Sequence, residues 1–242
     1  MTSLDTAYNY QRYRSHQLLA PVADGMLDQF EITSKVGFFP GGHDLTPERL
    51  RTAVRRTAED LGRIPDTVLL HNPECSVDDF EKACQALMVV RDEKLCQAWG
   101  ISTWNPQNLA EHSWEVPRPD VVMVRAGLSV PTHVLDAAER FTVQMAVPRV
   151  WGMAPFGGNA KDTVWSKTDT SLFLAPGQRA TRRQAAVATA FVIPKVERLA
   201  VGISSPAHLA EIVQAESLTT STEVVDRYRA LLRRRAYGRN TA

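Results

Sequence analysis

Four residues that can donate, hold or orient a proton follow the first strand-like segments of this chain. Asp5 and Tyr10 stand in the stretch DTAYNY, Lys35 in ITSKVG and His71 in TVLLHNP. A free tyrosine is a weak acid near neutral pH, but an ammonium a few ångströms away favours its ionised form. A carboxylate can hold that ammonium in place, and a neutral histidine can donate a hydrogen bond to a carbonyl oxygen. The four residues therefore predict a proton-donating site with Tyr10 as the acid.

Each of these residues also has an ordinary structural explanation. An aspartate that closes a strand is often only an N-cap, and a histidine after an apolar strand is more often a hydrogen-bonded core residue. Their order along the chain and their places at strand ends favour the functional interpretation.

The segments that must position these residues alternate between strand-like and helix-like patterns. The predicted strands are Met1–Asp5, Phe30–Gly37, Thr67–Pro73, Ala98–Asn105, Val121–Leu128, a segment at 147–156, and Arg198–Ser205. The predicted helices are Thr46–Gly62, Val77–Cys96, one from Pro106, Pro131–Thr142, Thr181–Val192, Pro206–Ala215 and Ser221–Arg235. Such alternation predicts parallel strands joined by helices, in either a doubly wound sheet or a (β/α) barrel. Reactive groups gather at the carboxyl ends of strands in both folds.

Composition limits the classes of partner. The 242 residues fit one large α/β domain or two small ones, and 28 Lys and Arg against 27 Asp and Glu argue against nucleic acid or an anionic membrane as main partner. No apolar stretch approaches membrane-spanning length. Three cysteines without metal-type pairing predict a reduced, cytoplasmic protein with no metal site.

Several stretches together resemble one family. DTAYNY resembles the D-T-A-x-x-Y motif of the aldo-keto reductase superfamily, and ITSKVG and LLHNP resemble its lysine and histidine strands. WGISTWNPQNL is similar to the family's G-x-S-N-F strand and loop, and LAVGISSPAHLAE to its final cofactor loop and helix. VWGMAPFGG stands where the family has a strand ending in tyrosine, serine and proline.

The resemblance implies one (β/α) TIM-type barrel domain over residues 1–242, with Asp5, Tyr10, Lys35 and His71 as its catalytic tetrad. The D-T-A motif ends the second barrel strand in that family, so the usual first strand–helix unit is expected to be missing from this sequence. Either the gene lacks that unit, or Met1 lies downstream of the real start. A barrel without that unit has two open edges, and open edges invite pairing. A second copy of the chain, a swapped segment or the last helix could cover them, and a homodimer is one expectation.

The resemblance also implies NADPH or NADH as cofactor and a small carbonyl compound as substrate. The cofactor would contact Ser102, Thr103, Met123, Met153, Gly202, Ser204, Ser205 and Glu211, and the substrate Phe38 and Trp104. His43, on the loop after Lys35, is expected to be solvated, and the loop Asn159–Ala180 to act as a lid.

Some of these positions depart from the family pattern. Thr103 replaces the usual asparagine, Met123 a glutamine and Met153 a stacking tyrosine, while Ser204 takes the place of a basic residue that grips the adenosine phosphate. Methionine can cover a ring, but it cannot replace the hydrogen bonds of glutamine. Weak or absent cofactor binding is therefore expected.

Three functions remain open at this point. A carbonyl reductase dependent on NAD(P)H is favoured by the tetrad and the GISSP loop. A redox-neutral dehydratase, lyase or isomerase that reuses the tetrad is favoured by the altered cofactor pocket and the missing first unit. A non-catalytic binding subunit is disfavoured, because a scaffold has no need of a lysine buried beside a tyrosine.

Overall fold

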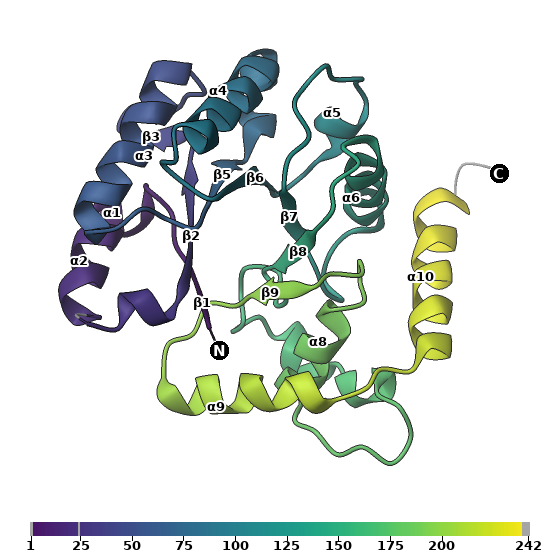
Figure 1. Cartoon of the computed structure of the whole chain (residues 1–242). Helices are drawn as coiled ribbons and strands as arrows, with labels where there is room; N and C mark the ends of the chain where they lie inside the picture. The colour runs from purple at the N-terminus through teal and green to yellow at the C-terminus, as the bar shows by residue number, and fades with distance from the viewer. Residues whose placement is uncertain (1, 24, 239–242) are drawn as a thin grey trace. The chain divides into compact units, whose positions relative to one another are not determined.

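The fold is a parallel sheet of successive strand–helix units, drawn in Figure 1. The computed structural model of the chain describes residues 2–23 and 25–238. Within these ranges seven strands form one sheet in the order β1-β2-β5-β6-β7-β8-β9. They are β1 (Ser3–Asp5), β2 (Glu31–Val36), β5 (Thr67–His71), β6 (Ala98–Thr103), β7 (Val121–Arg125), β8 (Val150–Met153) and β9 (Arg198–Ala200).

The strand order decides between the two folds that the sequence left open. The strands follow one another in the sheet in chain order, whereas a doubly wound sheet reverses its order at a switch point. The seven predicted parallel strands are confirmed, and the doubly wound alternative is excluded. Met1, part of the predicted first strand, lies outside the described residues.

A small hairpin and ten α-helices complete the described part of the chain. The hairpin pairs β3 (Phe38–Phe39) with β4 (Gly42–His43). The helices are α1 (Tyr10–Tyr13), α2 (Ser15–Val22), α3 (Pro47–Leu61), α4 (Phe80–Asp92), α5 (Gln107–Ala110), α6 (Thr132–Gln144), α7 (Val164–Lys167), α8 (Arg182–Ala190), α9 (Pro206–Gln214) and α10 (Thr222–Tyr237). Short 3₁₀ helices are η1 (Leu27–Gln29), η2 (Pro73–Cys75), η3 (Val77–Asp79), η4 (Thr170–Phe173) and η5 (Ala215–Ser217).

The chain divides into two compact units. Unit 1 comprises Met1–Met123 and Phe141–Arg149, and unit 2 comprises Val124–Arg140 and Val150–Ala242. The single domain predicted over residues 1–242 stays a prediction.

Unit 1 is built on strands with nearly continuous apolar runs, which suits parallel strands buried on both faces. In β5 the residues Val68, Leu69 and Leu70 have no exposed surface. Helices α3 and α4 lie side by side and pack against β2 and β5 (Figure 1). α3 begins at Pro47 and ends at Gly62, whose φ of 70° suits a glycine at a helix end. Both of these helix ends were predicted from the sequence.

Unit 2 holds its helices through side-chain caps and ion pairs. Thr181 and Gln184 form a reciprocal capping box at the start of α8, and Ser221 caps α10. On α10, Arg229 pairs with Glu139 of α6, and the Tyr228 hydroxyl donates to the carbonyl of Leu128. α10 therefore belongs to the packed structure of unit 2.

Several of the element limits predicted from the sequence differ from the structure. The helix predicted over Val77–Cys96 begins with a 3₁₀ turn and ends at Asp92, because the chain reverses at Lys94 with φ of 60°. The last predicted strand stops at Ala200. The predicted lid contains α7 and η4, and Phe173 within it is buried in a core cluster, so the second half of the segment is anchored.

Candidate active site

An ion pair at the ends of β1 and β2 forms the base of the site. Lys35 is 2% exposed, and its Nζ donates to Asp5 Oδ2 at 2.6 Å and to the carbonyl oxygen of Thr6 at 3.0 Å. The register aligns Asp5 with Thr33 and Lys35 with Leu69, so the two side chains meet near the carboxyl ends of their strands. Burial raises the pKa of the Asp5 carboxyl, and the Lys35 ammonium opposes that rise.

Tyr10 lies over this pair and is open to solvent. The Lys35 Nζ is 5.2 Å from the centre of the Tyr10 ring, and the ring centres of Tyr10 and His71 are 6.0 Å apart. The Tyr10 side chain is 41% exposed, so a small molecule can reach it. All four predicted tetrad residues are thus brought together within unit 1.

The backbone after Tyr10 is strained in a way that the sequence did not reveal. Gln11, Arg12 and Tyr13 have φ of 51°, 56° and 66°, and the left-handed conformation costs a residue other than glycine roughly 1–2 kcal/mol. The turn is tied down from both sides. Tyr13 packs on the ring of Tyr8 at 5.8 Å, and the Tyr8 amide donates to the Lys35 carbonyl.

His71, the last residue of β5, is held neutral. Burial, and then the charges of Lys35 and His43, lower the pKa of the His71 imidazole to about 3. Its Nδ1 is buried without a hydrogen-bond partner in the part of the chain that the structure describes. A proton on Nδ1 would therefore lack an acceptor, which leaves Nε2 as the atom that carries the ring proton.

His43 is a residue of this site whose place was predicted wrongly. It is half-buried rather than solvated, and its Nε2 lies 2.9 Å from the carbonyl oxygen of His71. Its Nδ1 lies 2.8 Å from Ser76 Oγ. The predicted substrate residue Phe38 stands edge-on to both imidazoles. No sequence signal distinguishes such a histidine from a solvated one on a polar loop.

Glu74 is a second residue that sequence reasoning missed. Its Oε1 accepts from the backbone amides of Trp104 and Asn105 at 2.7 and 2.9 Å, which ties the loop after β5 to the loop after β6. Burial raises the pKa of the Glu74 carboxyl, while those amides lower it. The predicted substrate residue Trp104 is thereby fixed through its backbone and keeps a 37% exposed side chain.

The predicted cofactor residues of unit 1 are buried. Ser102, Thr103 and Met123 are at most 2% exposed. Ser102 pairs in register with His71, so the end of β6 lies beside the tetrad. The Thr103 hydroxyl is buried too, and its hydrogen bond to the Glu74 carboxyl helps to lower the pKa of that carboxyl.

The predicted cofactor residues of unit 2 gather mainly around the start of α9. Gly202 and Ser204 are exposed, and the Ser205 hydroxyl caps the helix by accepting from the amide of His208. The free amides of a helix start favour anions, so this end suits a phosphate. Glu211 is already engaged by the Thr181 hydroxyl and the Arg183 guanidinium of unit 2. Met153 ends β8 and is half-buried.

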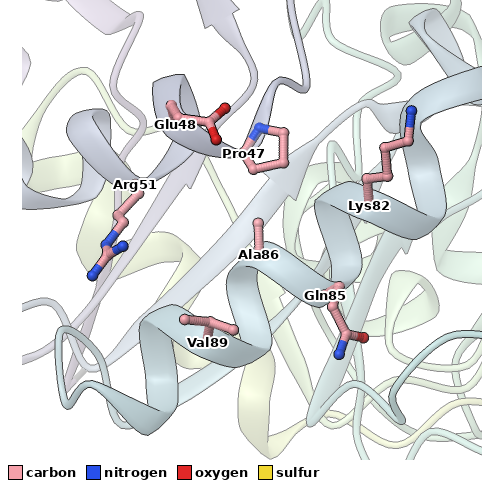
Figure 2. Close-up of a pocket in the computed structure, with 7 residues that line it drawn as sticks. All are labelled: Pro47, Glu48, Arg51, Lys82, Gln85, Ala86 and Val89. Carbon is pink, nitrogen blue, oxygen red and sulfur yellow. The ribbon is translucent and has the colours of Figure 1, made fainter.

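A groove elsewhere in unit 1 does not coincide with this chemistry. It lies between α3 and α4, has a volume of about 390 Å³, and is lined by Pro47, Glu48, Arg51, Lys82, Gln85, Ala86 and Val89 (Figure 2). None of these is a predicted site residue. Over the described residues, no three His, Cys, Asp or Glu side chains are grouped to hold a metal ion. No described helix combines the length and apolarity that crossing a membrane requires.

Removing the Glu74 carboxylate should destabilise the fold locally. We expect Glu74→Ala to lower the free energy of unfolding by about 1–2 kcal/mol, because two amides lose a charged acceptor, whereas Glu74→Gln should retain most of it. Urea denaturation measures both. Glu81→Ala is the control, since within the described ranges Glu81 accepts from one amide, that of Glu115. Equal losses in Glu74→Ala and the control would contradict this role.

The lowered pKa of the His71 imidazole should make the free energy of unfolding depend on pH in the acid range. Between its usual value of 6.5 and about 3, the unfolded imidazole takes up a proton that the folded one refuses. Stability is therefore fully present above the usual value and falls as the pH drops towards 3. From about pH 7 to about pH 4, wild-type protein should lose up to about 3 kcal/mol more than His71→Gln in urea denaturation. Parallel losses in the two proteins would count against a neutral buried His71.

Comparisons with known proteins agree with this geometry. The family model for the aldo/keto reductase family matches residues 1–233. The aldo-keto reductase AKR11C1 from Bacillus halodurans in its holo form is similar, with a TM-score of 0.74 and 18% identity over 96% of this chain and 82% of that one. An aldo/keto reductase from Klebsiella pneumoniae, solved in complex with NADP and acetate, has a TM-score of 0.74 and 19% identity over 96% and 80% of the two chains.

A putative aldo-keto reductase from Pseudomonas aeruginosa is also similar, with a TM-score of 0.64 and 22% identity over 90% of this chain and 78% of that one. No curated protein sequence matches the chain. These structural likenesses show the fold, which is that of a (β/α) TIM-type barrel. With a family match that covers nearly its whole length, the chain belongs to the aldo/keto reductase family.

Proposed function

We propose that this protein reduces a small carbonyl compound with a nicotinamide cofactor, and that Tyr10 is the proton donor. The observation that carries the proposal is the buried Lys35 ammonium, paired with Asp5 and lying 5.2 Å from the centre of the exposed Tyr10 ring. Burying a cation is costly unless it is paired. Its placement beside an exposed tyrosine ring is therefore best explained by chemistry at the hydroxyl of that tyrosine.

Each tetrad residue has one task in this proposal. The Tyr10 hydroxyl gives its proton to the carbonyl oxygen as negative charge develops there. The neutral His71 donates a hydrogen bond from Nε2 to the same oxygen. Lys35 stabilises the phenolate that Tyr10 leaves behind, and Asp5 keeps Lys35 charged and in place.

The cofactor supplies the hydride when it is bound. The hydroxyls of Ser102 and Thr103, at the end of β6 beside the tetrad, suit its nicotinamide amide, and Thr103 would share its hydroxyl with Glu74. The start of α9, with Gly202, Ser204 and Ser205, suits its phosphates. Met123 and Met153 contribute only apolar contact, and Glu211 binds the cofactor only by giving up a present partner.

The redox-neutral alternative rests on the same apolar positions. Met123 is buried and offers no hydrogen bond where a glutamine is usual in the family. A dehydratase, lyase or isomerase would need Tyr10 and Lys35 but no hydride. The substrate in either case is a small molecule in contact with Phe38 and Trp104. A second copy of the chain that covers an open sheet edge, and a cytoplasmic location, remain parts of the proposal.

Removing the Tyr10 hydroxyl tests the proton donor. Tyr10→Phe should lower the turnover of aromatic and aliphatic aldehydes about 10²–10⁴-fold, because general acids contribute about that much. Oxidation of NADPH followed at a single wavelength measures the rate. Tyr13→Phe, on the same turn, is the matched control and should keep wild-type turnover. Undiminished turnover in Tyr10→Phe would sink the assignment.

Cofactor affinity tests the altered pocket. We expect calorimetry to show weaker binding of NADPH than is usual for this family and little discrimination against NADH. Introducing a cation at the start of α9 in Ser204→Arg should raise the affinity for NADPH about tenfold, because a charge-assisted hydrogen bond contributes about 1.5–3 kcal/mol. The control Ser204→Gln adds length without charge and should not. Micromolar binding of NADPH by the wild type, with clear discrimination, would show that the pocket is an ordinary one.

A further inference from the structure

The backbone ladder between β2 and β5 stops just before His71. Its last pair is Val36 with Leu70. Gly37, with φ of 147°, then leads the chain into the β3–β4 hairpin. The carbonyl of His71 therefore lies beyond the ladder with β2. A side chain, rather than the backbone of β2, forms a hydrogen bond with this carbonyl. That side chain is His43, whose Nε2 is 2.9 Å from the carbonyl oxygen.

The directions of these hydrogen bonds follow from the atoms involved. A carbonyl oxygen only accepts, so the His43 Nε2 carries a proton and donates it. The Nδ1 of the same ring faces Ser76 Oγ at 2.8 Å. A serine hydroxyl donates to a neutral imidazole and accepts from a charged one. Both bonds of His43 therefore persist in either charge state.

The surroundings leave His43 little freedom. A Cβ at Gly37 would stand 2.9 Å from the His71 carbonyl oxygen and 3.2 Å from the His43 Nε2, so no other residue fits there. The Phe38 ring is centred 4.7 Å from the ring of His43 and 5.0 Å from that of His71, edge-on to both. The hairpin thus fixes the position of one imidazole relative to the other.

His71 needs such support because its own ring has little. Its Nδ1 has no partner over the described residues, so no hydrogen bond at that atom orients the imidazole. The direction of its Nε2 depends on its backbone and on edge-on contacts with Phe38 and Tyr10, whose ring centres lie 5.0 and 6.0 Å away. A displacement of about 1 Å at a reacting group can cost roughly 10²-fold in rate.

We propose that His43, held by Ser76, is a positioning residue that caps the end of β5 and thereby directs the His71 Nε2 at the substrate. The proposal rests on the proposed reductase function for its effect on rate. The other part of the proposal, that the orientation of the His71 ring depends on His43, does not require the reductase function.

Three variants and a control separate the hydrogen bond from the bulk of the side chain. His43→Leu removes the donor to the His71 carbonyl, and His43→Gln keeps a donor at a similar reach. Ser76→Ala removes the hydrogen bond to Nδ1 of the His43 imidazole. His133→Leu, a change at an exposed histidine of α6, is the control. Thermal melting of each variant establishes that it is folded.

The kinetic readout is kcat for aldehyde reduction with NADPH. His43→Leu should lower kcat about 30- to 100-fold with little change in KM, because His71 is misdirected rather than lost. His43→Gln should stay within about threefold of the wild type, since it restores the donor. Ser76→Ala should fall between them, and the control should match the wild type. A His43→Leu enzyme with wild-type kcat, or equal losses in the Leu and Gln variants, overturns the proposal.

The second readout does not depend on turnover. In protein labelled with ¹⁵N-histidine, the ring signals of His71 should shift in His43→Leu and return in His43→Gln. The signals of buried His16, whose ring bonds Ser34 Oγ, serve as the internal reference and should not move. Unshifted His71 signals in His43→Leu overturn the proposal. If the wild type reduces no aldehyde, the reductase function fails while this spectrum still decides the positioning role.

Discussion

The buried ammonium of Lys35 is the charge around which the candidate site is arranged. Taking a cation out of water costs several kcal/mol unless a carboxylate and other acceptors meet it. Asp5 and the carbonyl of Thr6 do so, at 2.6 and 3.0 Å. The loop after β1 must therefore run close to β2, and the amide of Tyr8 fixes it there by donating to the Lys35 carbonyl. The position of Tyr10 follows from that constraint.

The same charge explains the state of His71. Burial disfavours its protonated form, and the nearby ammonium adds to that effect, so the imidazole stays neutral, as the proposed hydrogen bond to the substrate requires. One anion, one cation, one neutral acid and one neutral donor then meet in a small space. The left-handed turn at residues 11–13 fits this picture, because backbone strain persists where the surroundings over-determine the conformation. Here the contact between the Tyr8 and Tyr13 rings holds the turn, together with the Ala7 carbonyl, which accepts from the Tyr10 amide and the Ser15 hydroxyl.

The fold and the clustering of Asp5, Tyr10, Lys35 and His71 could be predicted from the sequence because each has a local signal. Apolar runs interrupted by Gly and Pro indicated the seven strands, and the residues at strand ends indicated Asp5, Lys35 and His71. The supporting residues could not be found in this way. His43 and Glu74 act through single contacts with a backbone carbonyl or with backbone amides, and such contacts depend on which loops the sheet brings together. Helix ends such as Asp92 were missed because a lysine, not a glycine, adopts the reversing conformation at residue 94.

The surroundings of the tetrad differ in chemistry from the positions predicted for the cofactor. Around the tetrad, the side chains of Lys35, His43 and Glu74 form hydrogen bonds with backbone groups of neighbouring loops and strand ends. The positions of the four tetrad residues are therefore tightly constrained. At the positions predicted for the cofactor, the available groups are serine and threonine hydroxyls, two methionines and the start of one helix. Neutral hydroxyls contribute less than charged groups to holding a phosphate. In the proposed reductase, the acid is therefore held precisely, whereas the groups offered to a hydride carrier hold it weakly. Cofactor affinity, rather than the geometry of Tyr10, is the property that separates a reductase from a redox-neutral enzyme built on the same residues.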